Sequence, residues 1–216
     1  MSDWPQTRWS MCSKQNDSAA EARRPSPLRI AITGGIGSGK SYVCSRLETA
    51  GYPVFYCDDE AKRIIRTSPV VREALTSLIG PDVYDRDGHL VKPVLAAYIC
   101  GSPLQADKVN AIVHPRVADA FREWTMRQSA PIVFMECALL YESGFDALVD
   151  VTALVVVPED VRLRRVIERD HVTAEKARAW MSLQLPEPEK AARAGFLLHN
   201  DGSGRLDEDI AALLRL

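Results

Sequence analysis

The chain of 216 residues carries 27 lysines and arginines against 29 aspartates and glutamates, which gives a formal net charge of −2. This length fits one α/β domain with room for an inserted lobe, and the near balance of charge gives no support for a polyanion-binding or membrane-attracted surface. No apolar run approaches the length of a membrane span, and the opening MSDWPQTRWSMCSKQ lacks the apolar core of a signal peptide. The five cysteines show no metal-site spacing. We therefore expect a cytoplasmic protein without a nucleic-acid or membrane partner.

Residues 1–27 form a polar first segment that is interrupted by prolines and shows neither helix nor strand periodicity. A segment of this composition buries too little apolar surface to become ordered by itself. We predict a disordered N-terminal extension. Trp4 and Trp9 leave open the alternative that the extension docks onto the rest of the chain.

The chain alternates between strand and helix patterns from Leu28 onward. Such alternation is typical of a mostly parallel sheet with helices on both faces, so the predicted fold class is α/β. The apolar strand candidates are RIAIT, PVFY, PIVFM, TALVVV and FLLH.

A glycine-rich loop follows the first predicted strand, in the stretch ITGGIGSGKSYVCS at residues 32–45. Gly34, Gly39, Lys40 and Ser41 fit the spacing G-x-x-x-x-G-K-[ST] between a short apolar strand and a helical pattern. Glycines let the backbone turn its N–H groups around an anion, and the following helix points the positive end of its dipole at the same place. A glycine-rich turn that binds nothing is the alternative. We predict a nucleoside triphosphate site.

Two later stretches bear on the chemistry of the chain. About seventy mainly helical residues, from 59 to 129, separate the second and third predicted strands. This is too long for a simple crossover helix, and we expect this region to bind a second substrate. After the fourth strand comes a charged helical stretch with four arginines. For Arg162 and Arg164 we favour a solvated helix face, whereas Arg165 and Arg169 share one face and could close over a nucleotide as part of a lid.

The class of triphosphate enzyme can be narrowed by what the sequence contains. A regulatory GTPase needs an Asn-Lys-x-Asp segment to bind guanine, and none is present. DRDG at residues 85–88 matches the D-x-x-G spacing but stands in a polar turn rather than at a strand end. A small metabolite kinase fits the chain better.

The motifs together resemble the dephospho-coenzyme A kinase family from about residue 28 to the C-terminus. The P-loop of that family reads T-G-G-I-G-S-G-K-S, as here, and further motifs follow it in the same order and with the same spacing. The matching segments are TGGIGSGKS (33–41), VFYCDDEAKRI (54–64), DGHL (87–90), N-x-x-x-H-P (110–115), ALLYE (138–142), the P-E-x-x-x-x-x-R-x-x-x-R-D stretch (158–170), QLPEPEK (184–190) and HNDG (199–202).

The resemblance implies a reaction and a fold. Members of the family transfer the γ-phosphoryl group of ATP to the ribose 3′-hydroxyl of dephospho-CoA, a small-molecule substrate, to complete coenzyme A. Their fold is of the P-loop nucleoside-kinase type, with a five-stranded parallel sheet flanked by helices. On this basis we expect a kinase domain at 28–216, with an inserted helical CoA-binding region at about 59–129 and a lid at about 159–194.

The resemblance also implies residue roles. Lys40, Asp58, Arg165 and Arg169 are the expected catalytic residues, and Ser41 would ligate Mg²⁺. Asn200 and Gly202 match the segment that lines the adenine. The residues expected to bind ATP are Gly35, Ile36, Gly37, Ser38, Gly39, Lys40, Ser41, Tyr42, Asn200 and Gly202.

Four carboxylate or imidazole groups are expected on the acceptor and metal side of the site. Asp58 would accept or orient the proton of the attacking hydroxyl, or it could be a helix N-cap. Glu136 is expected to reach Mg²⁺, or to be a strand-end carboxylate without a ligand. His114 and Glu142 are expected to bind substrate, although a histidine before proline could equally shape a helix start.

The chain departs from the family pattern at two positions in the site. Tyr56 replaces the first aspartate of the family's Asp-x-Asp segment, which leaves its role to Asp58 alone or to neighbouring Asp59. Tyr42 replaces a small threonine after the P-loop serine, where only the backbone is needed. Two alternatives to a dephospho-CoA kinase remain at this point: another small P-loop kinase, and a homologue that binds nucleotide without turnover.

Overall fold

The structure is a computed structural model that describes residues 26–216. The predicted disordered extension, with Trp4 and Trp9, falls almost wholly outside the described residues. Within them, no helix is both long enough and apolar enough to cross a lipid bilayer.

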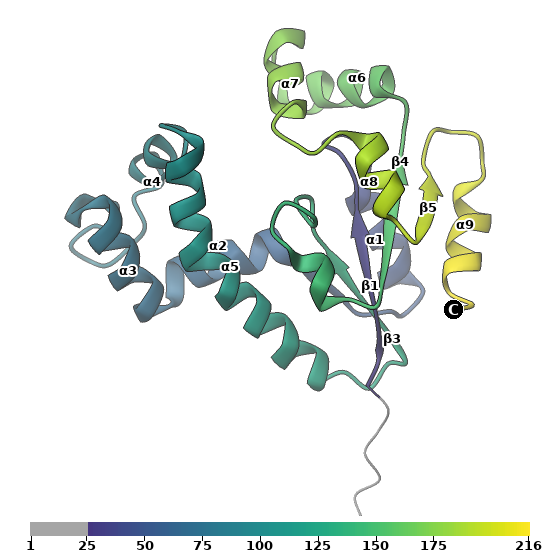
Figure 1. The fold of residues 1–216 in the computed structure, drawn as a ribbon, viewed down its shortest axis with the longest axis horizontal. Helices are drawn as coiled ribbons and strands as arrows, with labels where there is room; N and C mark the ends of the chain where they lie inside the picture. Colours follow the sequence, from purple (N-terminus) through teal and green to yellow (C-terminus); the bar gives the residue numbers. More distant parts are fainter. Residues whose placement is uncertain (1–25) are drawn as a thin grey trace, which may run out of the picture.

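A five-stranded parallel sheet forms the centre of the molecule, as predicted (Figure 1). The strand order is β2-β3-β1-β4-β5, and every neighbouring pair is parallel. The chain moves from β1 to one side of the sheet and later returns to the other side, so the carboxyl end of β1 lies at a topological switch point, where ligands bind in sheets of this kind. The strands are β1 (Leu28–Thr33), β2 (Val54–Tyr56), β3 (Ile132–Glu136), β4 (Val151–Val156) and β5 (Phe196–His199).

Helices cover both faces of this sheet. On one face, α1 and α9 pack against Ile30, Ile32 and Phe134; on the other, α5 and its neighbours pack against Ala31 and Met135. Successive residues of β1 therefore serve opposite cores, as the two-residue period of a strand requires. The helices of the described residues are α1 (Lys40–Thr49), α2 (Cys57–Thr67), α3 (Pro69–Ile79), α4 (Lys92–Ile99), α5 (Pro103–Met126), α6 (Glu159–Asp170), α7 (Ala174–Met181), α8 (Glu187–Arg193) and α9 (Leu206–Leu213), with the 3-10 helices η1 (Pro81–Val83) and η2 (Phe145–Leu148).

The insertion between β2 and β3 is mainly helical, as the sequence indicates, and extends to one side of the sheet (Figure 1). Its helices α2 and α5 pack on each other and connect it to the sheet. Phe55 of β2 contacts Phe121 and Trp124 of α5, with ring centroids 5.3 and 5.4 Å apart. This aromatic contact anchors the insertion beside the carboxyl end of β2.

The long helix α5 corrects one alternative from the sequence. His114 and Pro115 lie in its middle, so the His-Pro pair does not mark the start of a helix. The helix continues past the proline to Met126, about three turns further, and it carries the His114 side chain toward η2. The histidine is therefore placed by a tertiary contact of α5 rather than by a helix terminus.

Candidate active site

The glycine-rich loop connects β1 to α1 and forms the floor of the site. Gly37 and Gly39 have φ values of 81° and 87°, in the left-handed region that favours glycine. A Cβ atom on Gly39 would lie 2.3 Å from Nδ2 of Asn200. Gly39 is also the N-cap of α1 and offers no side-chain cap. The first amides of α1 therefore point at the loop without a side-chain partner, which is the geometry of an anion site.

Half-buried Lys40 and buried Glu136 carry opposite charges that influence each other above this floor. Lys40 Nζ donates a hydrogen bond to the Gly34 carbonyl at 3.0 Å. Burial lowers the pKa of Lys40, while the negative charges of Glu136 and Asp58 oppose that shift. Burial raises the pKa of Glu136, Lys40 opposes the shift, and Asp58 reinforces it. Burying both groups has a desolvation cost, and groups with shifted pKa values concentrate at functional sites.

A single cavity of about 660 Å³ gathers most of the predicted site residues. Three residues that the sequence analysis did not select, Lys62, Ala138 and Gln184, line it as well. Lys62 lies four residues after Asp58, a spacing that places both on one helix face and could have identified it. The predicted residues that line the cavity are Ile36, Gly37, Gly39, Lys40, Ser41, Asp58, Glu136, Arg165 and Arg169.

Asp58 lies inside helix α2 and is not its N-cap residue. Tyr56 is the N-cap residue of α2 and makes no side-chain cap hydrogen bond, and Asp58 lies in the first turn of the helix. The interpretation of Asp58 as an N-cap is therefore wrong. The α2 helix starts immediately at the end of β2, so it turns this carboxylate toward the glycine-rich loop instead.

The two arginines expected in a lid differ in their contacts. Arg165 donates hydrogen bonds to the carbonyl oxygens of Gly37, Ser38 and Asn200, at 3.4, 3.5 and 3.1 Å. Arg169 is paired with Asp170 at 2.7 Å, and its side chain is 61% exposed. Arg165 is thus already bound to the loop, whereas Arg169 remains largely in solvent at the cavity wall.

The segment after β5 contacts the same loop through one of its two predicted residues. Asn200 Nδ2 donates to the Ser38 carbonyl at 2.9 Å. Gly202 lies further along the turn with φ of 88° and does not line the main cavity. Tyr42 is half exposed, and its N–H donates to the Gly39 carbonyl within the first turn of α1.

Arg162 contradicts the expectation of a solvated position. It is buried, and its Nη2 lies 3.1 Å from Oε2 of Glu187. A Cβ atom on Gly35 would lie only 2.3 Å from Nη1 of Arg162, so the guanidinium packs directly beneath the loop. Arg162 shares a helix face with buried Val166, four residues on, and this period could have indicated its burial. Arg164 is exposed, as expected.

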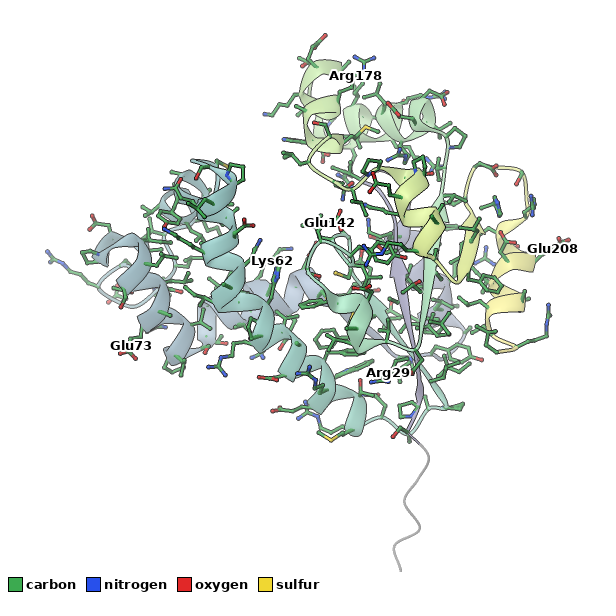
Figure 2. All side chains as sticks on the ribbon, in the orientation of Figure 1. Arg29, Lys62, Glu73, Glu142, Arg178 and Glu208 are labelled. Atoms are coloured by element: carbon green, nitrogen blue, oxygen red, sulfur yellow. The ribbon has the colours of Figure 1, made fainter. Side chains whose placement is uncertain are left out.

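The connection between α7 and α8 is bound to the loop from the other side. Gln184 Oε1 accepts a hydrogen bond from the N–H of Ile36 at 2.7 Å. Glu142 Oε1 accepts one from the N–H of Leu185 at 2.8 Å and lies 3.6 Å from Nζ of Lys190. Figure 2 shows Glu142 on the loop that faces this connection. Glu142 therefore connects the chain after β3 to the segment that follows α7.

Glu142 and His114 are brought together, but in a second cavity. This cavity of about 510 Å³ lies between α5 and the chain around η2, and Asn110 and Arg122 also line it. The His114 ring packs edge-on against Phe145, with centroids 5.4 Å apart, and burial lowers the pKa of His114. This shift favours the neutral imidazole.

The site also offers oxygen donors suited to a hard cation. The Ser41 hydroxyl and the carboxylates of Asp58 and Glu136 line the same cavity. Mg²⁺ takes oxygen ligands and is held by one or two protein groups together with substrate phosphates. The donors present therefore fit Mg²⁺.

The DRDG turn at residues 85–88 lies outside this cavity. The side chain of Asp85 accepts hydrogen bonds from the N–H groups of Asp87 and His89.

Comparisons with known proteins agree with this geometry. The family model described as dephospho-CoA kinase matches residues 28–205. A dephospho-CoA kinase from Bacteroides fragilis is 40% identical over 188 residues, covering 87% of this chain and 91% of that protein. One from Salinibacter ruber is 41% identical, covering 81% of this chain and 89% of that protein.

Solved structures show the same fold. The crystal structure of a Thermus thermophilus protein matches with a TM-score of 0.77 and 37% identity, covering 88% of this chain and 98% of that one. A dephospho-CoA kinase from Campylobacter jejuni matches with a TM-score of 0.65 at 20% identity, over 87% of this chain and 96% of that one. The family model, the curated relatives and the P-loop architecture lead to one assignment: the chain belongs to the dephospho-CoA kinase family.

Proposed function

We propose that the chain transfers the γ-phosphoryl group of ATP to the ribose 3′-hydroxyl of dephospho-CoA, giving coenzyme A and ADP in the cytoplasm. The observation that carries the proposal is the main cavity, where the glycine-rich loop faces a carboxylate on a separate helix. The loop can hold a donor phosphate and Asp58 can meet an acceptor hydroxyl on the opposite side. The free buried thiols of Cys44, Cys57 and Cys137 support a reducing compartment.

The loop and its cations would hold the donor. The amides at the start of α1 bind phosphate oxygens, and Lys40 leaves the Gly34 carbonyl to contact the outer phosphates. Arg165 is held over the loop, and Arg169 can turn from Asp170 toward the transferring group. Phosphoryl transfer depends mainly on positioning and charge neutralisation, so these cations supply much of the rate.

Asp58 would serve the acceptor. A carboxylate on the first turn of α2 can accept the proton of the 3′-hydroxyl, or orient that hydroxyl toward the phosphorus, as the oxygen attacks. Tyr56 offers no carboxylate in place of the family's first aspartate, so we assign this role to Asp58; Asp59, which also lines the cavity, is the alternative. Such a group typically contributes about 10²–10⁴-fold to the rate.

Ser41 and Glu136 are the residues we propose to hold Mg²⁺, with Glu136 acting through water. When bound, the ion supplies positive charge that neutralises the phosphate oxygens. The raised pKa of Glu136 fits this role, because burial disfavours its charged form more than nearby Lys40 favours it, and a further bound cation would favour that form. Ser41, as the second residue of α1, presents its hydroxyl to the same cavity.

We propose that the second cavity binds a part of dephospho-CoA away from the reacting ribose hydroxyl. His114 and Glu142 line it from α5 and the chain after β3, and a neutral imidazole there can donate or accept a hydrogen bond. Asn200 and Gly202 remain the proposed adenine-binding segment for the donor.

A coupled ADP-release assay tests the proposal. The purified protein is given ATP and Mg²⁺ with dephospho-CoA, adenosine or pantetheine as acceptor. ADP release that depends on dephospho-CoA and exceeds the rates with the other two acceptors supports the assignment. ATP binding without turnover, or preference for another alcohol, would reject it.

A further inference from the structure

The charged wall of the main cavity contains a cation that the proposed mechanism does not use. Among the described residues that line the cavity, Lys40, Arg165, Arg169 and Lys62 carry positive charge. Lys40 is the first residue of α1, and Arg165 and Arg169 lie on α6; the proposed mechanism assigns all three to the donor phosphates. Lys62 lies on α2, the helix that carries Asp58.

The position of Lys62 is set by the helix. It follows Asp58 by four residues, so the two side chains share one face, about one 5.4 Å turn apart. Both line the cavity. Figure 2 shows Lys62 on the side of α2 that faces the loops at the end of the sheet. A molecule that presents a hydroxyl to Asp58 therefore occupies the cavity that Lys62 also lines.

The ammonium is available for a ligand. Lys62 Nζ pairs with Oδ1 of Asp59 at 2.9 Å, and the two side chains are 65% and 73% exposed. Exposed pairs of this kind contribute little to stability, so exchanging the carboxylate for a phosphate costs little.

We propose that Lys62 binds the 5′-diphosphate of the acceptor while Asp58 meets the 3′-hydroxyl of the same ribose. The inference rests on the proposed function, because dephospho-CoA carries its diphosphate and its reactive hydroxyl on one sugar. The two groups are separated by little more than that ring, which suits side chains one helical turn apart. Lys62 would thereby select an acceptor with phosphate at the 5′ position.

The experiment compares Lys62→Met with Arg63→Met. Arg63 is a matched control, since it lies on the same helix, pairs with Glu60 three residues before it, and has a side chain 58% exposed, but does not line the cavity. Steady-state KM values for dephospho-CoA and ATP are measured for both variants and for the wild type. The dissociation constant of dephospho-CoA is measured by calorimetry. Lys62→Arg tests rescue by a second cation.

The expected result is selective. Lys62→Met should raise the KM and dissociation constant of dephospho-CoA about 10- to 100-fold, the range for losing a hydrogen bond to a charged group. The KM of ATP should change less than about twofold, Lys62→Arg should recover most of the affinity, and Arg63→Met should match the wild type. An unchanged KM for dephospho-CoA in Lys62→Met, or an equal rise for ATP, would overturn the inference. Absence of turnover in the wild type would instead reject the proposed function.

Discussion

Replacing Asp58 with asparagine removes one negative charge from the cavity while keeping the size of the side chain. Asp58 lies in the first turn of α2 and provides no cap, so the loss to stability is limited to its favourable interaction with the helix dipole. That interaction is worth at most about 1 kcal/mol, or roughly 4 °C in Tm for a chain of this size. The loss in turnover should be at least about a hundredfold if the carboxylate accepts or orients the hydroxyl proton.

The assay measures kcat with saturating ATP and dephospho-CoA, the dissociation constant of ATP, and Tm. Glu60→Gln is the matched control, since Glu60 lies in the same first turn and does not line the cavity. It should lose more stability than Asp58→Asn, because it also weakens the pair with Arg63, and it should keep its kcat. Near-normal turnover of Asp58→Asn would refute the reasoning. If Asp59→Asn lost activity instead, the catalytic carboxylate would be Asp59 rather than Asp58.

Three further substitutions test other parts of the site. Lys40→Ala should reduce kcat by about a hundredfold or more, because it removes a cation aimed at the phosphates; wild-type-like turnover in protein free of contaminating kinase would contradict this. Arg169→Ala should depress kcat more than it weakens ATP binding, because we expect Arg169 to contact the phosphoryl group only in the transition state. A loss of ATP affinity with unchanged kcat would instead make Arg169 a residue that binds ATP in the ground state. Arg162→Met should lower stability by roughly 3 kcal/mol, since it leaves Glu187 partly buried without its partner; chemical denaturation that shows no loss, or no recovery in the double variant with Glu187→Met, would contradict the buried pair.

Much of the fold could be predicted because its determinants are local. Each strand of the sheet is a short apolar run between turn residues, and all five predicted strands are confirmed. The glycine-rich loop was equally accessible, since Gly34, Gly39, Lys40 and Ser41 must occur at fixed spacing to surround an anion. These features depend on neighbours within about ten residues of each other.

The remaining features depend on contacts between distant parts of the chain. In the sequence, Arg162 is one of several charged residues in a polar helix. It becomes buried only because α6 packs against the glycine-rich loop. Gln184 lies 148 residues from Ile36, whose amide it binds, and no spacing rule connects them. The helix position of Asp58 was missed for a different reason: α2 begins without a gap after β2, and helix starts without a capping side chain leave a weak pattern.

The identity of the phosphorylated product tests the central claim most directly. The wild-type protein is incubated with ATP, Mg²⁺ and dephospho-CoA, and the product is analysed by mass spectrometry and phosphorus NMR. We predict that each ADP released is matched by one coenzyme A that carries a new phosphate monoester on the ribose 3′-oxygen. ADP release without that ester, or an ester on a different oxygen, would contradict the claim.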